Sequence, residues 1–213
     1  PNRCLGCASC VKACPEGDVL GLVGGKAALV DPSACIGHGA CRDACPFDAI
    51  TLVLGTENRG IEIPRLGRDF QTAVPGIFVA GELGGMGLIR NAVEQGRQAM
   101  EAIRALPGVG RGDRLDVVIV GAGPAGFSAS LAALQHGLRF VTLGQETLGG
   151  TVAHYPRGKI VMTAPCELPL FGRIRLRETS KESLLALWHE VVRSTGLELR
   201  CQERVESVNR DGD

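Results

Sequence analysis

Two cysteine runs near the N-terminus constrain the fold of this chain most strongly. Residues 4–15 read CLGCASCVKACP, in the pattern C-x2-C-x2-C-x3-C-P, and residues 35–46 read CIGHGACRDACP, with a histidine where the pattern has a cysteine. Thiolates three residues apart on a short loop can surround one face of an iron–sulfur cube, whereas the cysteine before the proline points to the other cube. The two runs therefore predict two iron–sulfur clusters that share their ligands crosswise.

The crosswise rule assigns a set of ligands to each predicted cluster. The first cluster, of the 4Fe-4S type, receives four thiolates, from Cys4, Cys7, Cys10 and Cys45. The second cluster receives three thiolates, from Cys14, Cys35 and Cys41. Its fourth corner falls at His38, and the glycines on both sides of this histidine would let the loop approach the cluster closely.

His38 allows several interpretations, which the sequence leaves open. Its ring nitrogen could ligate the fourth iron, the corner could lack its iron and leave a 3Fe-4S cluster, or a 4Fe-4S cluster could carry a non-protein ligand there. Alternatively, the ring only donates a hydrogen bond to a cluster sulfur. Because imidazole carries less negative charge than thiolate, as in Rieske centres, we expect the second cluster to be the easier one to reduce.

Zinc is the alternative for closely spaced cysteines, but a zinc site needs four ligands in one closed tetrahedron. Seven cysteines in two runs that each end in Cys-Pro fit two iron–sulfur clusters better. Residues 1–54 resemble the two-cluster bacterial ferredoxins, including the AIT tripeptide after CPFD. The CIGHGAC run is similar to ferredoxins that serve monooxygenases, in which this position often accompanies a three-iron cluster. The resemblance implies an α+β ferredoxin-like fold.

Composition narrows the function classes for the whole chain of 213 residues. Its 23 basic and 23 acidic residues are interspersed and only 4% of residues are aromatic, which argues against nucleic-acid binding. No apolar run approaches the roughly 18 residues that a membrane span needs. Cysteines used for clusters indicate a reducing, cytoplasmic compartment, and Cys166 and Cys201 are expected to be ordinary thiols. The chain opens with Pro1 and stops at RDGD, so we expect it to be a piece of a longer protein.

A second motif lies in residues 115–143, LDVVIVGAGPAGFSASLAALQHGLRFVTL. An apolar run at 116–120 and a β-rich run at 139–143 flank an Ala-rich stretch, so the sequence predicts strand, turn, helix and strand. Gly121, Gly123 and Gly126 fit G-x-G-x-x-G, which permits a tight turn, a close approach to a pyrophosphate and close helix packing. Together with Pro124 and Ala125 at the helix start, they predict a dinucleotide site. A merely glycine-rich packing turn is the alternative.

The ribose-binding position departs from the fingerprint. An acidic residue is expected at the end of the second strand, but that position falls near Gly144, in the sequence LGQETLGG. Gln145 or Glu146 could substitute from the loop.

Residues 74–103 suggest which dinucleotide binds. They resemble the closing segment of thioredoxin-reductase-like flavoproteins, in which a strand ends in an A-G-D type turn over the flavin and a helix follows. Here the turn reads Ala80, Gly81 and Glu82, and the resemblance implies FAD, with Glu82 reaching a ribitol hydroxyl. Apolar residues at helical spacing predict a core-facing helix, with Leu88, Ile89, Ala92, Val93, Ala99, Met100 and Ile103 on one face.

The order of these segments is the reverse of that in the flavoprotein family. A strand at 77–80, a returning helix and a linker at 106–114 could form a crossover to a parallel strand at 116–120. We therefore expect the two strands to be neighbours in one sheet, in circularly permuted order, with Glu82 and Gly123 at the same edge. Alternatively, the closing segment belongs to another protomer or to a lost module.

The C-terminal part continues the resemblance. Residues 149–165 look like the flavin-side loop of the same family, with His154 and Tyr155 in it and no catalytic role assigned to either. Thr179 and Glu182 form a capping-box pattern for a helix that should stop at Gly196, and residues 197–208 read as a strand. The helix should bury one apolar face, formed by Leu184, Leu185, Trp188, Val191 and Val192.

The predicted organisation is a two-cluster ferredoxin domain (1–55), a flavoprotein closing segment (56–105), a linker (106–114) and a Rossmann-type α/β FAD-binding half-domain (115–213), truncated at its C-terminus. These parts predict an oxidoreductase that passes electrons between NAD(P)H, FAD and the two clusters. The alternatives are a redox-sensing or nucleotide-binding module without turnover, or a disulfide reductase whose dithiol lies in a missing part. We expect a redox partner protein or a small-molecule acceptor, and leave association into a homo-oligomer open.

Overall fold

The computed structural model describes residues 3–37, 39–52, 64–84, 88–162, 165–175 and 178–209. Contacts divide the chain into two compact units, residues 1–87 and 88–213. The division falls inside the predicted closing segment, because its helix packs within the second unit.

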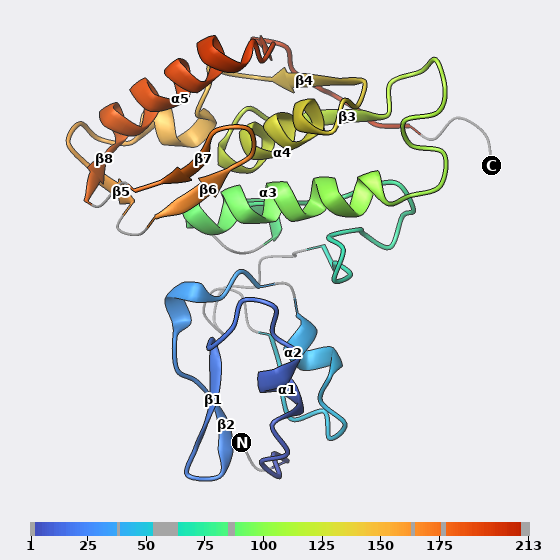
Figure 1. Ribbon diagram of the computed structural model, residues 1–213, viewed down its shortest axis with the longest axis vertical. Coiled ribbons are helices and arrows are strands. Elements are labelled where there is room, and N and C mark those ends of the chain that lie inside the picture. Colours follow the sequence, from blue (N-terminus) through green and yellow to red (C-terminus); the bar gives the residue numbers. More distant parts are fainter. Residues whose placement is uncertain are drawn as a thin grey trace. The chain divides into compact units, whose positions relative to one another are not determined.

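The N-terminal unit combines two short helices with a β-hairpin (Figure 1). Strands β1 and β2 pair antiparallel, with Leu20 opposite Leu29 and Val23 opposite Lys26. Helices α1 and α2 each follow a residue in the left-handed region, Ala8 at φ 61° and Gly39 at φ 80°. The elements of this unit are α1 (Ser9–Lys12), β1 (Leu20–Val23), β2 (Lys26–Leu29), η1 (Pro32–Ala34), α2 (Ala40–Asp43) and η2 (Glu82–Gly84).

Residues 77–80 do not form the predicted strand beside residues 117–120. Phe78 instead makes an antiparallel bridge with Gln71, and Val79 N–H donates to the Phe70 carbonyl at 3.0 Å. Pro75 and Gly76, at φ 84°, lie in the turn that Ile77 N–H closes on Val74. A local turn of this type satisfies backbone groups that the predicted sheet would have used.

The second unit contains a three-stranded parallel sheet (Figure 1). Strands β3 (Val117–Val120) and β4 (Phe140–Gly144) pair in register from Val117 with Phe140 to Val120 with Leu143, as the sequence predicts. Helix α4 (Pro124–Gln135) connects them. Strand β9 (Arg200–Cys201) adds to the other edge of β4, so only a small part of the strand predicted at 197–208 is paired.

Helix α3 (Ile89–Arg104) lies alongside α4 (Figure 1). The predicted core face is confirmed except at its first position, since Leu88 precedes the helix and its side chain is 55% exposed. The other six predicted positions are buried, namely Ile89, Ala92, Val93, Ala99, Met100 and Ile103.

Helix α5 (Lys181–Thr195) closes the apolar core of this unit. Trp188 is buried and its ring centroid lies 5.2 Å from that of Phe127 in α4. Gly196, at φ 68°, ends the helix as predicted. The predicted cap is shifted by one residue: Ser180 is the N-cap and accepts from Ser183 N–H at 3.2 Å. Both Thr179 and Ser180 also pair with β5.

Two small antiparallel pairs and a 3-10 helix complete the unit. They are η3 (Gly150–His154), β5 (Ile160–Met162) with β8 (Thr179–Ser180), and β6 (Cys166–Leu168) with β7 (Gly172–Ile174). Within the described ranges, none of the helices is both long and apolar enough to cross a membrane.

Candidate cluster and dinucleotide sites

The four cysteines predicted for the first cluster line one cavity of the N-terminal unit. Cys4, Cys7 and Cys10 come from the first run, and Cys45 comes from the second. The cavity has a volume of about 100 Å³, and apolar side chains such as Leu5, Leu22 and Phe47 complete its wall. The fold thus brings together thiols from the two runs, as crosswise sharing requires.

Backbone and hydroxyl groups surround these thiols with hydrogen bonds. Ala27 N–H donates to Cys4 Sγ at 3.3 Å, and Ala49 N–H donates to Cys45 Sγ at 3.3 Å. The bond from Ala27 lowers the pKa of Cys4, and the bond with the Ser9 hydroxyl lowers the pKa of Cys7. Burial instead raises the pKa of Cys10. Groups that favour the thiolate over the thiol suit a set of iron ligands, since the thiolate is the ligating form.

A second group of thiols comprises Cys14, Cys35 and Cys41. Burial raises the pKa of Cys41, and the nearby thiols of Cys35 and Cys14 raise it further, which places the three in one electrostatic neighbourhood. His38, the candidate fourth ligand, lies outside the described residues. The glycines beside it both adopt the left-handed backbone conformation, each at φ 80°, which a residue with a side chain rarely adopts.

Single-ion sites differ from this arrangement. Among the residues that the structure describes, no group of three or more His, Cys, Asp or Glu side chains could hold one metal ion. The thiols of the first group instead stand around a cavity, which fits a group as large as an iron–sulfur cluster.

The glycine-rich turn of the second unit lies between β3 and α4. Gly121 adopts φ 109°, and its N–H donates to the Leu143 carbonyl at 2.7 Å. A Cβ on Gly126 would lie 1.9 Å from the Gly121 carbonyl oxygen, so glycine is needed there for packing. Pro124 is the first residue of α4. The turn has the conformation and the close helix contact that the sequence predicts.

Gly123 differs from Gly126 because space is open beside it. A Cβ at this position would meet only the Gly149 carbonyl oxygen, at 3.9 Å. Gly123 is also the N-cap of α4, and no side chain caps the helix there. The turn therefore leaves open space beside a helix N-terminus whose N–H groups no side chain caps. This arrangement fits the pyrophosphate of a dinucleotide.

The loop after β4 returns to this turn. Gly149 N–H donates to the Ala122 carbonyl at 2.9 Å. A Cβ on Gly144 would lie 3.0 Å from the Ala122 Cβ, which explains why the position expected to carry an acidic residue holds glycine. Glu146, two residues further on, lies within hydrogen-bonding distance of His154, at 2.7 Å between Oε2 and Nε2. Gln145, the other candidate for the ribose position, directly follows β4.

Sequence reasoning did not find the pairing of Glu146 with His154, because the two residues are far enough apart that only the loop conformation joins them.

Gly81 and Glu82, the candidates from the closing segment, lie in the N-terminal unit: Gly81 adopts φ 87°, and Glu82 begins η2. Their part in a flavin site stays a prediction.

Comparison with family models gives two matches. Residues 1–46 match the 4Fe-4S dicluster domain, and residues 116–164 match the FAD binding domain. Comparisons with curated proteins and with solved structures give no match. The first match covers both cysteine runs, and the second covers β3, α4, β4 and the loop that follows them. Both parts of the resemblance seen in the sequence are thereby confirmed, and the chain carries a 4Fe-4S dicluster ferredoxin domain at its N-terminus and an FAD-binding domain after it.

Proposed function

We infer that this chain is an iron–sulfur flavoprotein oxidoreductase that passes electrons between NAD(P)H, FAD and two iron–sulfur clusters. The main observation behind this proposal is that one chain combines two features. Its N-terminal unit holds four thiols around a cavity, and its second unit holds a glycine-rich turn with open space at a helix N-terminus. A flavin exchanges electrons in pairs or singly, and iron–sulfur clusters exchange them singly. NAD(P)H enters the proposal through the resemblance to thioredoxin-reductase-like enzymes.

The residues of the dinucleotide site have distinct roles in this proposal. The second unit would be a Rossmann-type partial domain in which Gly123 admits the pyrophosphate beside Pro124 and Ala125 at the start of α4. Glu146 would accept a hydrogen bond from an adenosine ribose hydroxyl. His154 holds one carboxylate oxygen of Glu146, and the other makes no hydrogen bond with the described residues. The pair is exposed, with side-chain exposures of 64% and 46%, so its contribution to stability is small.

In the ferredoxin domain, the first thiol group would hold a 4Fe-4S cluster. Cys14, Cys35 and Cys41 would hold a second cluster, with His38 at its fourth corner, either as a ligand or beside a 3Fe-4S cluster. The acceptor would be a redox protein or a small molecule in the cytoplasm, where reducing conditions keep such thiols available.

Anaerobic purification with iron, sulfide and flavin quantified tests the proposal. Clusters and FAD in the same protein, reduced by NADH or NADPH, would support it. Clusters without any flavin would favour a redox-sensing module.

The Gly123→Val variant separates binding from folding. Because a side chain there enters open space, we expect folding and iron content to be retained and FAD to be lost. Fluorescence of Trp188, the single tryptophan, reports whether the second unit is folded. Gly126→Val is the matched contrast, since its side chain would collide with the Gly121 carbonyl and disturb the fold itself. Retention of FAD by folded Gly123→Val protein would contradict the assigned site.

A further inference from the structure

The β1–β2 hairpin contacts the loop of Cys4 and Cys7 at three points. Lys26 Nζ donates a hydrogen bond to the Cys4 carbonyl oxygen at 3.2 Å. Ala27 N–H donates to Cys4 Sγ at 3.3 Å. The carbonyl oxygen of Gly25 lies so close to Gly6 that a Cβ on Gly6 would come within 2.3 Å of it. The hairpin therefore holds this loop through a backbone N–H donor, a charged side chain and a close backbone contact at Gly6.

The turn of the hairpin fixes which residues reach Cys4. Gly24 and Gly25 both have positive φ, 58° and 74°, as in the two-residue turns that match the twist of paired strands. Val23 pairs with Lys26 directly across this turn. Consecutive residues of β2 thus present an ammonium group and an N–H group to the same cysteine.

Burial of apolar surface accounts for only part of the position of the hairpin. Leu22 lines the cavity of the first thiol group, but Val23 and Leu29 are 61% and 51% exposed. A structural role in a hydrophobic core would have these side chains buried. The contacts with the Cys4 loop are the better explanation for the position of the hairpin.

These contacts bear on the first cluster because a cluster gains negative charge when it is reduced. A cation and N–H donors close to a cluster stabilise its reduced state and raise its reduction potential. Lys26 supplies the cation, and Ala27 supplies the N–H donor to a ligand sulfur.

We propose that the β1–β2 hairpin tunes the first cluster, with Lys26 as the residue that raises its reduction potential. The proposal rests on the two-cluster function inferred above. Lys26 acts as a positioning and charge-supplying residue and not as a ligand. The second cluster, whose ligands come from other loops, should be much less affected by Lys26.

Redox titration of the anaerobic full chain, followed by electron paramagnetic resonance, tests this inference. The Lys26→Met variant removes the charge, and Lys26→Arg keeps it as the matched control. We expect Lys26→Met to lower the midpoint potential of the first cluster alone, while Lys26→Arg stays close to the wild type. In the wild type, added salt should lower the same potential by screening Lys26, and this salt dependence should be smaller in Lys26→Met.

The outcomes separate this inference from the proposed function. A wild-type protein without two clusters would contradict the proposed function. With both clusters present, an unchanged first potential, or equal shifts of both potentials, would overturn the role of Lys26. If Lys26→Met fails to retain its first cluster, the salt titration of the wild type tests the role of Lys26. A first-cluster potential that does not depend on salt would overturn this role.

Discussion

Gly96 of α3 faces the carbonyl oxygen of Ala125 in α4 so closely that a Cβ on Gly96 would lie 2.1 Å from it. The two helices therefore touch through their backbones at this point. The contact joins the helix of the predicted closing segment to the helix that begins at the glycine-rich turn.

We expect Gly96→Val to destabilise the second unit by about 1–3 kcal/mol, because backbone atoms cannot move aside as a flexible side chain can. Urea unfolding followed by Trp188 fluorescence measures this free energy. Gly112→Ala is the control, since a Cβ at Gly112 meets no atom within 4 Å and its φ is not positive. Equal stability of the two variants would show that the helices do not meet as described.

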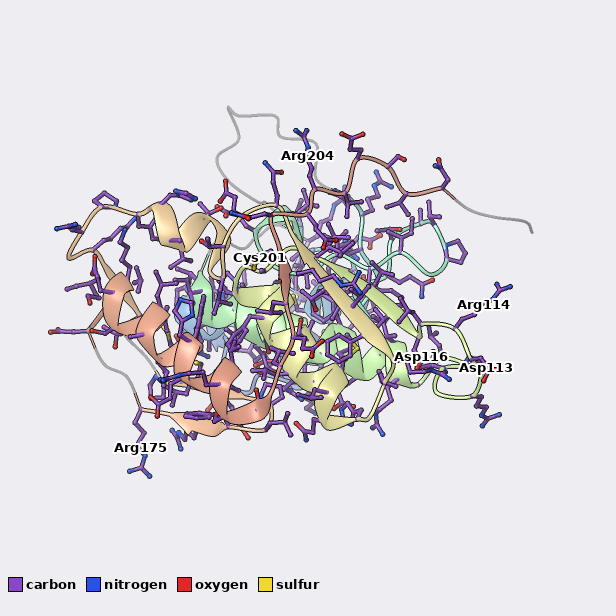
Figure 2. All side chains as sticks on the ribbon, turned by 90° about the horizontal axis from the view of Figure 1, so that it is seen from above. Asp113, Arg114, Asp116, Arg175, Cys201 and Arg204 are labelled. Atoms are coloured by element: carbon purple, nitrogen blue, oxygen red, sulfur yellow. The ribbon has the colours of Figure 1, made fainter. Side chains whose placement is uncertain are left out.

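Asp116 supplies a prediction about pH. Its carboxylate accepts from the Arg139 guanidinium at 2.9 Å, and from the backbone N–H groups of Arg139 at 2.9 Å and Gly110 at 2.7 Å. These hydrogen bonds, the one from the Arg139 side chain foremost, lower the pKa of Asp116 from 3.8 to about 2. Figure 2 shows Asp116 beside Asp113 and Arg114, in the loop that leads into β3.

A group whose pKa is lower in the folded state stabilises that state above its unfolded pKa and loses this effect as pH falls through the folded value. We therefore expect Asp116→Asn to be less stable than the wild type at pH 7, with the difference shrinking between about pH 4 and pH 2. Trp188 fluorescence during urea unfolding at each pH measures this difference. Asp113→Asn changes an exposed carboxylate in the loop that leads to Asp116 (Figure 2), and this variant should match the wild type throughout. A difference for Asp116→Asn that stays constant with pH would argue against the role of its charge.

Crosswise ligand sharing makes a specific prediction for Cys45. It lies in the second cysteine run but lines the cavity of Cys4, Cys7 and Cys10. Cys45→Ser should therefore alter or remove the first cluster and leave the signal of the second unchanged. Cys14→Ser should do the reverse. Iron analysis with electron paramagnetic resonance distinguishes the two clusters, and loss of the second signal in Cys45→Ser would mean that each run serves its own cluster.

The corner at His38 is tested by two substitutions. With a vacant or weakly held corner, the oxidised wild type shows a paramagnetic three-iron signal, His38→Ala barely changes it, and His38→Cys converts it to a 4Fe-4S cluster of lower potential. With histidine as a true ligand, the wild type contains two 4Fe-4S clusters and His38→Ala loses iron. Two clusters of low potential, both typical of full thiolate ligation, would contradict both alternatives.

Local patterns in the sequence were sufficient for the elements that position the dinucleotide site. The apolar runs predicted β3 and β4, the glycine spacing predicted the turn before α4, and Gly196 predicted the end of α5. These features depend on residues that are close along the chain, such as the approach of Gly126 to the Gly121 carbonyl. The cap of α5 was misplaced by one residue, since Thr179 and Ser180 are both good caps and both pair with β5, and only the hydrogen bond from Ser183 N–H identifies Ser180 as the cap.

Tertiary structure decided what depends on contacts between distant residues. The sequence by itself determined the two cysteine runs and the G-x-G-x-x-G turn, because spacing along a short loop dictates which thiols or N–H groups can converge. It did not determine that residues 77–80 would turn back on Gln71, that Glu146 would pair with His154, or that Lys26 would reach Cys4. These contacts depend on the conformations of loops. Several loop conformations can satisfy the same backbone hydrogen-bonding groups with nearly equal free energy, so the tertiary structure determines which one forms.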